Sequence, residues 1–127
     1  MSESSIYDAC DAIIAVDARG FIFGSAIAIK LKKPLIVARK PNKLPGKTIT
    51  REYDLEYGKN SLSLSQESID EFHNFVIVDD LIATGGTIEC IHKLIESQNK
   101  KISGLSVVIE LVDLKARKKF NFPVISQ

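Results

Sequence analysis

The residues best suited to chemistry lie in one short segment, residues 75–87. The segment reads Phe-Val-Ile-Val-Asp-Asp-Leu-Ile-Ala-Thr-Gly-Gly-Thr. A glycine pair allows the backbone to turn tightly and to present successive N–H groups to an anion. A helix that begins near Thr87 would direct the positive end of its dipole to the same place. We therefore expect a cradle for a phosphate monoester, formed by Ala83, Thr84, Gly85, Gly86 and Thr87.

Two acidic residues, Asp79 and Asp80, stand just before this turn. Carboxylates repel phosphate, but they accept hydrogen bonds from a vicinal diol such as the 2′- and 3′-hydroxyls of ribose. The pair can also serve only to cap the following helix, which is a common arrangement. Because no lysine follows the second glycine, the segment lacks the Walker pattern, and cleavage of a nucleoside triphosphate is disfavoured. The segment predicts a phosphorylated ribose as ligand.

Basic residues gather in two other places. Arg19 precedes Gly20 directly after an apolar run, where a guanidinium fork and backbone amides are suited to grip a diphosphate. Arg39, Lys40 and Lys43 form a cluster in a chain whose formal net charge is only +1. Surface charges of this kind are usually solvated. The position of the cluster after an apolar run favours a place in the same crevice as the glycine pair.

The elements that would position these residues are apolar strands alternating with helices. Short apolar runs predict buried strands, and longer runs with helical spacing predict helices. The expected strands are residues 12–16, 35–38, 75–78 and 105–111, and the expected helices are residues 21–31 and 87–97. This alternation favours an α/β fold with a mostly parallel sheet flanked by helices. Ligands of such folds bind at the carboxyl ends of the strands, where the segments 17–20, 39–47 and 79–87 begin.

The remaining segments predict smaller elements. Residues 48–57 and 61–65 alternate in a way that predicts a β-hairpin turning at residues 58–60. Asp113 is expected to cap a short basic helix that ends near Lys119. Residues 123–125 predict a final short strand, and the basic residues 117–119 are expected to be solvated surface.

Composition limits the class of protein. With 127 residues and 14.0 kDa, the chain is expected to form a single domain over residues 1–127. The near-neutral charge excludes nucleic-acid or membrane binding by bulk electrostatics. Cys10 and Cys90 lack metal-ligand spacing and are expected to be reduced thiols. No signal sequence or membrane-spanning stretch is evident, so we expect a cytoplasmic protein.

Several motifs in a consistent order resemble the type I phosphoribosyltransferases. The apolar strand, acidic pair and Thr-Gly-Gly-Thr turn of residues 75–87 are similar to that family's phosphoribosyl-pyrophosphate motif. Over about residues 11–126 the chain resembles the branch that acts on adenine, the adenine phosphoribosyltransferases. The segments that carry this closer resemblance are residues 17–24, 39–40, 43–46, 55–58 and 109–111.

The resemblance implies the family's fold with a β-hairpin lid. It also implies a purine-salvage glycosyltransferase that converts adenine and 5-phosphoribosyl 1-pyrophosphate into AMP and pyrophosphate.

The resemblance implies roles for the basic residues as well. Arg39, Lys40 and Lys43 match positions that meet the pyrophosphate group. Arg19 lies in the segment that matches the family's pyrophosphate loop. That loop often contains a cis peptide bond before a residue other than proline, and we expect one at Asp17–Ala18.

Glu56 and Tyr57 match the family's mobile catalytic loop, although their pattern alone suits an exposed strand pair. Displacement at an anomeric carbon passes through an oxocarbenium-like state that water would intercept, so a lid that excludes water is needed. Glu56 is expected to handle a proton or stabilise charge at the purine, and Tyr57 to pack over the site. Leu111 would by default belong to the core, but it matches a position that contacts the flat purine.

The family resemblance also implies a cation and a partner. Mg²⁺ is expected to bind through the pyrophosphate and ribose oxygens, with no direct protein ligand. A homodimer is expected, with no nucleic-acid or membrane partner.

Family members usually begin with a segment that forms a hood over the base. Only a short stretch precedes Ala12 here, so we expect this hood to be largely absent, which leaves base selectivity open. The alternatives are a phosphoribosyltransferase for another purine such as xanthine or guanine, or a non-catalytic ribose-phosphate sensor or inactive fragment.

Overall fold

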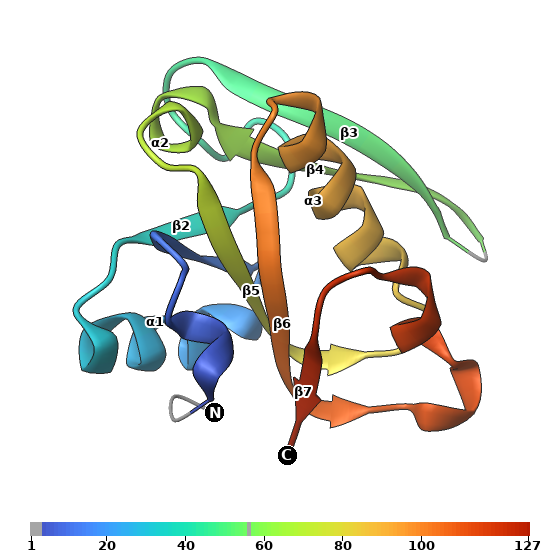
Figure 1. Cartoon of the computed structure of the whole chain (residues 1–127). Coiled ribbons are helices and arrows are strands. Elements are labelled where there is room, and N and C mark those ends of the chain that lie inside the picture. Colours follow the sequence, from blue (N-terminus) through green and yellow to red (C-terminus); the bar gives the residue numbers. More distant parts are fainter. Residues whose placement is uncertain (1–3, 56) are drawn as a thin grey trace.

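The computed structural model describes residues 4–55 and 57–127, and its centre is a five-stranded parallel sheet (Figure 1). The strand order is β2-β1-β5-β6-β7, and every neighbouring pair is parallel. The strands are β1 (Ala12–Val16), β2 (Leu35–Ala38), β5 (Asn74–Ile82), β6 (Lys101–Glu110) and β7 (Val124–Ser126). The predicted α/β fold with a mostly parallel sheet is therefore confirmed.

Helices α1 (Gly20–Leu31) and α3 (Gly86–Ser97) cover opposite faces of this sheet. Successive residues of a strand point to opposite faces, and here both faces are apolar. Ile13 and Val76 belong to the cluster on the α1 side, whereas Ile14 and Ile77 belong to the larger cluster on the α3 side. Burial on both faces explains why the strands could be predicted as continuous apolar runs.

The β-hairpin forms a second, two-stranded sheet from β3 (Thr48–Leu55) and β4 (Gly58–Ser65). The predicted turn at residues 58–60 is wrong, because Lys59 and Asn60 already pair with Asp54 and Tyr53. Gly58 has a φ of 120°, a value that few other residues adopt, and it opens β4 directly after the turn. The hairpin lies along α3, where the Sγ of Cys90 donates to the carbonyl oxygen of Arg51 at 3.4 Å.

Four short elements complete the described chain. They are η1 (Ser5–Tyr7), α2 (Gln66–Asp70), η2 (Val112–Leu114) and η3 (Ala116–Lys119). The sequence reading missed α2, although Ser65 caps it by accepting a hydrogen bond from the N–H of Ser68. The predicted capping role of Asp113 is wrong, since this residue lies inside η2. Lys115 has a φ of 55° and divides the expected helix into two short turns.

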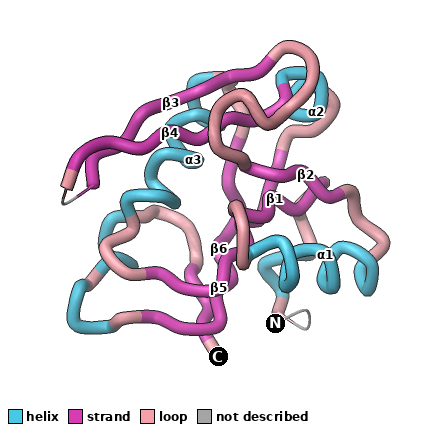
Figure 2. Tube along the Cα trace, turned by 180° about the vertical axis from the view of Figure 1, so that it is seen from behind, coloured by secondary structure: helices cyan, strands magenta, loops and turns pink. Residues whose placement is uncertain are grey.

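The view from behind places both termini at the end of the molecule away from the hairpin (Figure 2). Cys10 and Cys90 are free and buried, in agreement with the prediction of reduced thiols. In residues 4–55 and 57–127, no helix combines the length and apolar character that crossing a bilayer requires.

Candidate functional site

A cleft of about 480 Å³ lies at the carboxyl ends of β1 and β5. Its lining brings together several of the residues singled out from the sequence, namely Arg19, Lys40, Asp79, Asp80, Ala83, Thr84, Gly85, Gly86 and Thr87. Parallel strands end at the same edge of a sheet, so loops that are distant in the sequence meet there. The cleft is therefore the candidate site.

Residues 83–87 form a tight turn, which we call the glycine turn, between β5 and α3. Gly85 has a φ of 89°, in the left-handed region that favours glycine. A Cβ at this position would lie 3.2 Å from the Cβ of Ala116 and 3.3 Å from Cζ of Phe120, so the turn is also closely backed. The first N–H groups of α3 have no partner within the helix. The turn thus combines unpaired donors with the positive end of the helix dipole.

Asp79 and Asp80 belong to β5 and not to the loop in which they were expected. The strand continues because Leu81 and Ile82 still pair with Ile109 and Glu110 of β6. The backbone N–H of Asp80 donates to Oδ1 of Asp79 at 2.8 Å, which orients the Asp79 side chain.

The two carboxylates differ in their electrostatics. Burial, together with the neighbouring carboxyl of Asp80, raises the pKa of Asp79 to about 7. Asp80 is paired instead, because Nε of Arg19 lies 2.6 Å from its Oδ2. The floor of the cleft therefore holds a desolvated carboxyl beside one that is neutralised by an arginine.

The loop after β1 approaches this carboxylate pair closely. The Asp17–Ala18 peptide bond is cis, as expected. A Cβ at Gly20 would lie 2.9 Å from the carbonyl oxygen of Val78 and 3.0 Å from Oδ1 of Asp79. Glycine at this position therefore lets α1 begin directly against β5 and beside Asp79.

Asp17 links this loop to the basic segment after β2. Its Oδ2 accepts a hydrogen bond from the N–H of Lys40 at 3.4 Å and lies 3.6 Å from Nε of Arg39. Sequence reasoning did not single out Asp17. Its place at the end of a buried strand, two residues before Arg19, was the available signal.

Only one member of the basic cluster reaches the cleft. Among the described residues, Lys40 lines it, whereas Arg39 and Lys43 do not. The backbone of Arg39 pairs with Ser63 of the hairpin, and its Nη1 donates to the carbonyl oxygen of Lys43 at 3.5 Å. Arg39 and Lys43 therefore lie beside the site, in the segment that connects the sheet to the hairpin.

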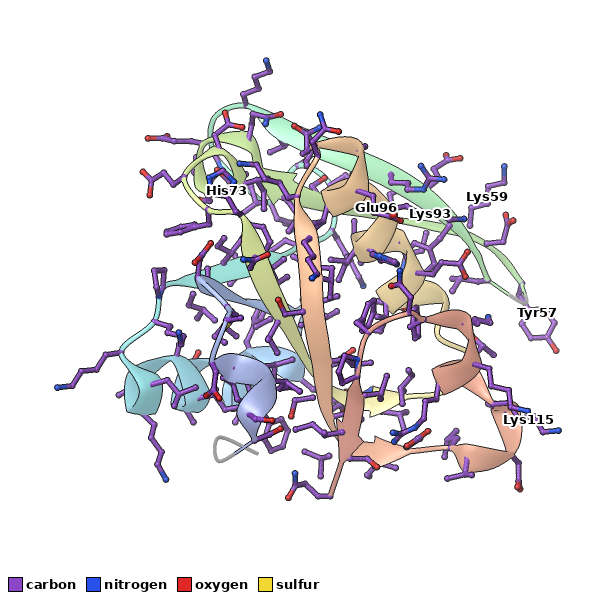
Figure 3. All side chains as sticks on the ribbon, viewed as in Figure 1. Tyr57, Lys59, His73, Lys93, Glu96 and Lys115 are labelled. Carbon is purple, nitrogen blue, oxygen red and sulfur yellow. The ribbon has the colours of Figure 1, made fainter. Side chains whose placement is uncertain are left out.

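Of the two expected lid residues, Glu56 lies outside the described residues. Tyr57 is 91% exposed and projects from the tip of the hairpin (Figure 3). Two other hairpin residues, Tyr53 and Asn60, face each other across the strands and line the cleft. The Oγ1 of Thr87 donates to the Tyr53 hydroxyl at 3.5 Å. Sequence reasoning missed Tyr53, although an aromatic residue in a polar strand was a usable signal.

Leu111 is 44% exposed and is not among the described residues that line the cleft. Its N–H donates at 3.0 Å to the carbonyl oxygen of Ile82, which does line it. Leu111 is therefore positioned next to the mouth of the cleft and is not part of the core.

The described residues contain no group of three or more His, Cys, Asp or Glu side chains that is placed to hold a metal ion. The cleft does contain oxygen donors, the carboxylates of Asp79 and Asp80. Hard divalent cations such as Mg²⁺ prefer oxygen ligands, often with most of the shell supplied by water and substrate.

Comparison with known proteins places this site in a family. Residues 3–122 match the family model described as a phosphoribosyl transferase domain. An adenine phosphoribosyltransferase of Prochlorococcus marinus is 59% identical over 126 residues, which cover 99% of this chain and 73% of that protein. The chain belongs to the phosphoribosyltransferase family.

Within that family, similar solved structures include adenine phosphoribosyltransferases. The enzyme from Thermoanaerobacter pseudethanolicus superposes with a TM-score of 0.85 at 41% identity, covering 92% of this chain and 69% of that one. The enzyme from Saccharomyces cerevisiae, in complex with an imino-altritol bisphosphate and adenine, has a TM-score of 0.84 at 33% identity. That match covers 94% of this chain and 69% of the yeast chain.

Proposed function

We propose that the cleft binds 5-phosphoribosyl 1-pyrophosphate and transfers its phosphoribosyl group to adenine, giving AMP and pyrophosphate. The observation that carries the proposal is the meeting of the glycine turn, the Asp79–Asp80 pair and Arg19 in one cleft. These are donors for a phosphate, acceptors for a diol and a cation for a second phosphate group. The bisphosphate and adenine in the similar yeast enzyme support the same pairing of ligands.

Each part of the cleft has a proposed partner on the substrate. The glycine turn receives the 5′-phosphate through the N–H groups of α3 and the hydroxyls of Thr84 and Thr87. The carboxylates of Asp79 and Asp80 accept hydrogen bonds from the ribose hydroxyls.

The pyrophosphate is proposed to lie on the side of the cleft opposite the glycine turn. Arg19 and Lys40 line the cleft, and Arg39 and Lys43 lie next to it. Asp17 holds the two basic segments together through Arg39 and Lys40. Charge neutralisation by these side chains favours departure of the pyrophosphate, because negative charge develops on it as the bond to C1′ breaks.

Mg²⁺ fits this site as a companion of the substrate. When bound to the pyrophosphate and ribose oxygens, it would neutralise the leaving group. Asp79 and Asp80 are the side chains that would face it, since both line the cleft and offer oxygen donors.

The transfer itself forms a bond between a ring nitrogen of adenine and C1′ and breaks the bond from C1′ to the pyrophosphate oxygen. Glu56 is proposed to accept or donate the proton at the purine, and Tyr57 to cover the site when the hairpin closes. Leu111, beside the cleft mouth, is proposed to pack against the purine ring. The protein thus contributes position, charge neutralisation and exclusion of water.

A homodimer in a reducing cytoplasm is proposed as the working form. Ile22 and Ile29 on α1 are 71% and 78% exposed, which leaves apolar side chains on the outer face of that helix. Two free, buried cysteines suit a reducing compartment. Sedimentation at several concentrations would establish the oligomeric state.

The experiment that tests the reaction is a comparison of purine bases. The chain is incubated with 5-phosphoribosyl 1-pyrophosphate, Mg²⁺ and labelled adenine, guanine, hypoxanthine or xanthine, and nucleotide and pyrophosphate are measured together. The proposal predicts AMP and pyrophosphate in equal amounts, with adenine the preferred base. Preference for a 6-oxo purine would overturn the choice of base. Absence of any nucleotide, also from a chain lengthened at its N-terminus, would overturn the transferase.

A further inference from the structure

Glu110 and Arg117 form a bidentate ion pair, here called the fork, outside the cleft. Nη2 of Arg117 lies 2.5 Å from Oε1 of Glu110, and its Nε donates to Oε2 at 3.1 Å. The remaining nitrogen, Nη1, donates to the carbonyl oxygen of Val124, and the hydroxyl of Ser126 donates to Oε1 of Glu110 at 3.1 Å. The fork therefore joins the end of β6, the turn η3 and the strand β7. Arg117 is exposed, as expected, and it is also held in this ion pair.

The turn η3 forms the back wall of the glycine turn. Ala116, which begins η3, is 2% exposed, and its Cβ would be 3.2 Å from a Cβ on Gly85. Phe120 directly follows η3, and its ring approaches the same point to 3.3 Å. Phe120 in turn stacks on the buried Phe122, with ring centroids 5.0 Å apart. Gly85 thus rests against a wall whose position depends on η3.

Local structure alone holds η3 weakly. A single turn of 3₁₀ helix has poor hydrogen-bond geometry and little intrinsic stability. Lys115, which precedes it, has a φ of 55° and projects outward at the bend between η2 and η3 (Figure 3). Tertiary contacts must therefore fix the turn.

The fork is well suited to that task. A guanidinium that bonds both oxygens of a carboxylate fixes orientation as well as distance. The Glu110 side chain is only 9% exposed, so the pair is partly shielded from water. The Arg117 guanidinium holds the pKa of Glu110 below its usual value.

We infer that Glu110 and Arg117 are positioning residues for the phosphate site. By fixing η3 they hold Ala116 and Phe120 against Gly85, and so keep the glycine turn in the geometry that accepts a phosphate. The inference rests on the proposed function, since it assigns a phosphate to that turn. It adds two residues that touch neither the cleft nor the substrate.

The test compares Arg117→Lys, which keeps the charge but loses the fork, with Glu110→Gln, which keeps the size but loses the charge. Lys118→Gln, at an exposed neighbour in η3, is the matched control. Binding of ribose 5-phosphate is measured by calorimetry, together with KM for each substrate, kcat and a thermal melt. We expect Kd for ribose 5-phosphate and KM for 5-phosphoribosyl 1-pyrophosphate to rise about tenfold in both variants. Their kcat and their KM for adenine should stay within about twofold of the values of the unmodified chain. The control variant should keep the Kd, KM and kcat of the unmodified chain.

The outcomes separate positioning from simple stability. If the two residues serve only stability, the variants should have fewer competent sites and a lower kcat, with an unchanged Kd for ribose 5-phosphate. That result would overturn the inference. If neither variant folds, the same measurements are made on Phe120→Leu, which alters the wall behind Gly85 without touching the fork. A raised Kd would support the inference, and an unchanged Kd would overturn it. Failure of the unmodified chain to bind ribose 5-phosphate would remove the phosphate site of the proposed function, and this inference with it. If the unmodified chain binds ribose 5-phosphate and the folded variants bind it with the same Kd, only this inference is overturned, and the proposed function stands.

Discussion

Nε of Arg19 lies 2.6 Å from Oδ2 of Asp80, so the loop after β1 and the end of β5 meet at one ion pair. The two residues are proposed to serve different parts of one substrate, the pyrophosphate and the ribose. Their contact fixes the relative position of these parts across the cleft. Because the Arg19 side chain is 75% exposed, the pair itself contributes little to folding, roughly 0–1 kcal/mol.

Arg19→Met should therefore separate binding from stability. A hydrogen bond to a charged group contributes about 1.5–3 kcal/mol, so KM for 5-phosphoribosyl 1-pyrophosphate should rise about 10- to 100-fold. The free energy of unfolding should change by less than about 1 kcal/mol. Lys30→Met, at an exposed position in the last turn of α1, is the control and should leave KM unchanged. An unaltered KM in Arg19→Met would remove Arg19 from the pyrophosphate site.

Gly85→Ala should damage both folding and phosphate binding. A left-handed φ of 89° costs an L-residue about 1–2 kcal/mol, and the new methyl group would press on Ala116 and Phe120. Gly46→Ala is a close control, because Gly46 has a φ of 74° but open space around it. Urea unfolding should show a larger loss for Gly85→Ala, and only this variant should lose affinity for ribose 5-phosphate. Equal affinity in both variants would contradict the role of the glycine turn.

Asp79 should make the protein less stable as the pH rises. Its pKa is raised from 3.8 to about 7, chiefly by burial, so between these values the folded state holds a proton that the unfolded state has lost. The contribution of Asp79 to the free energy of unfolding is therefore fully present below about pH 4, and it is lost as the pH rises through 7. Between pH 5 and 8 the unmodified chain should lose about 2–3 kcal/mol more of its free energy of unfolding than Asp79→Asn. Urea unfolding at both pH values measures this difference, and parallel losses would contradict the raised pKa.

Tyr57→Ala tests the proposed lid. The side chain is 91% exposed, so its removal should leave the thermal midpoint unchanged. If Tyr57 covers the site during transfer, kcat should fall about 10- to 100-fold as water enters. Lys59→Ala, on the same hairpin and also exposed, should retain full activity. Loss of activity in both variants would point to the hairpin as a whole and not to Tyr57.

Much of the fold could be predicted because its core strands are buried on both faces. The run Ala12–Val16 lies between two aspartates and the run Leu35–Ala38 lies between a proline and an arginine, and their predicted limits agree with the structure. The strand β5 was predicted too short, because Asp79 and Asp80 look like the start of a loop. Pairing with β6 extends it, and that pairing depends on a segment far along the chain.

The site was predictable only in part, for a similar reason. Residues of the glycine turn, Arg19 and Lys40 could be selected from local pattern and resemblance, and they line one cleft. Tyr53 stands out locally as an aromatic residue in a polar strand, but its contact with the site exists only once the hairpin lies against Thr87. The contact of Arg117 with Glu110 likewise appears only once β6 and β7 are neighbours.

The proposed place of the 5′-phosphate in the glycine turn can be tested by titrating the ¹⁵N-labelled chain with ribose 5-phosphate. Amide resonances report the environment of each N–H group. We expect saturable shifts that are largest for residues 84–88, with smaller shifts at Asp79 and Asp80. Shifts that do not saturate, or that are largest outside the cleft, would contradict it.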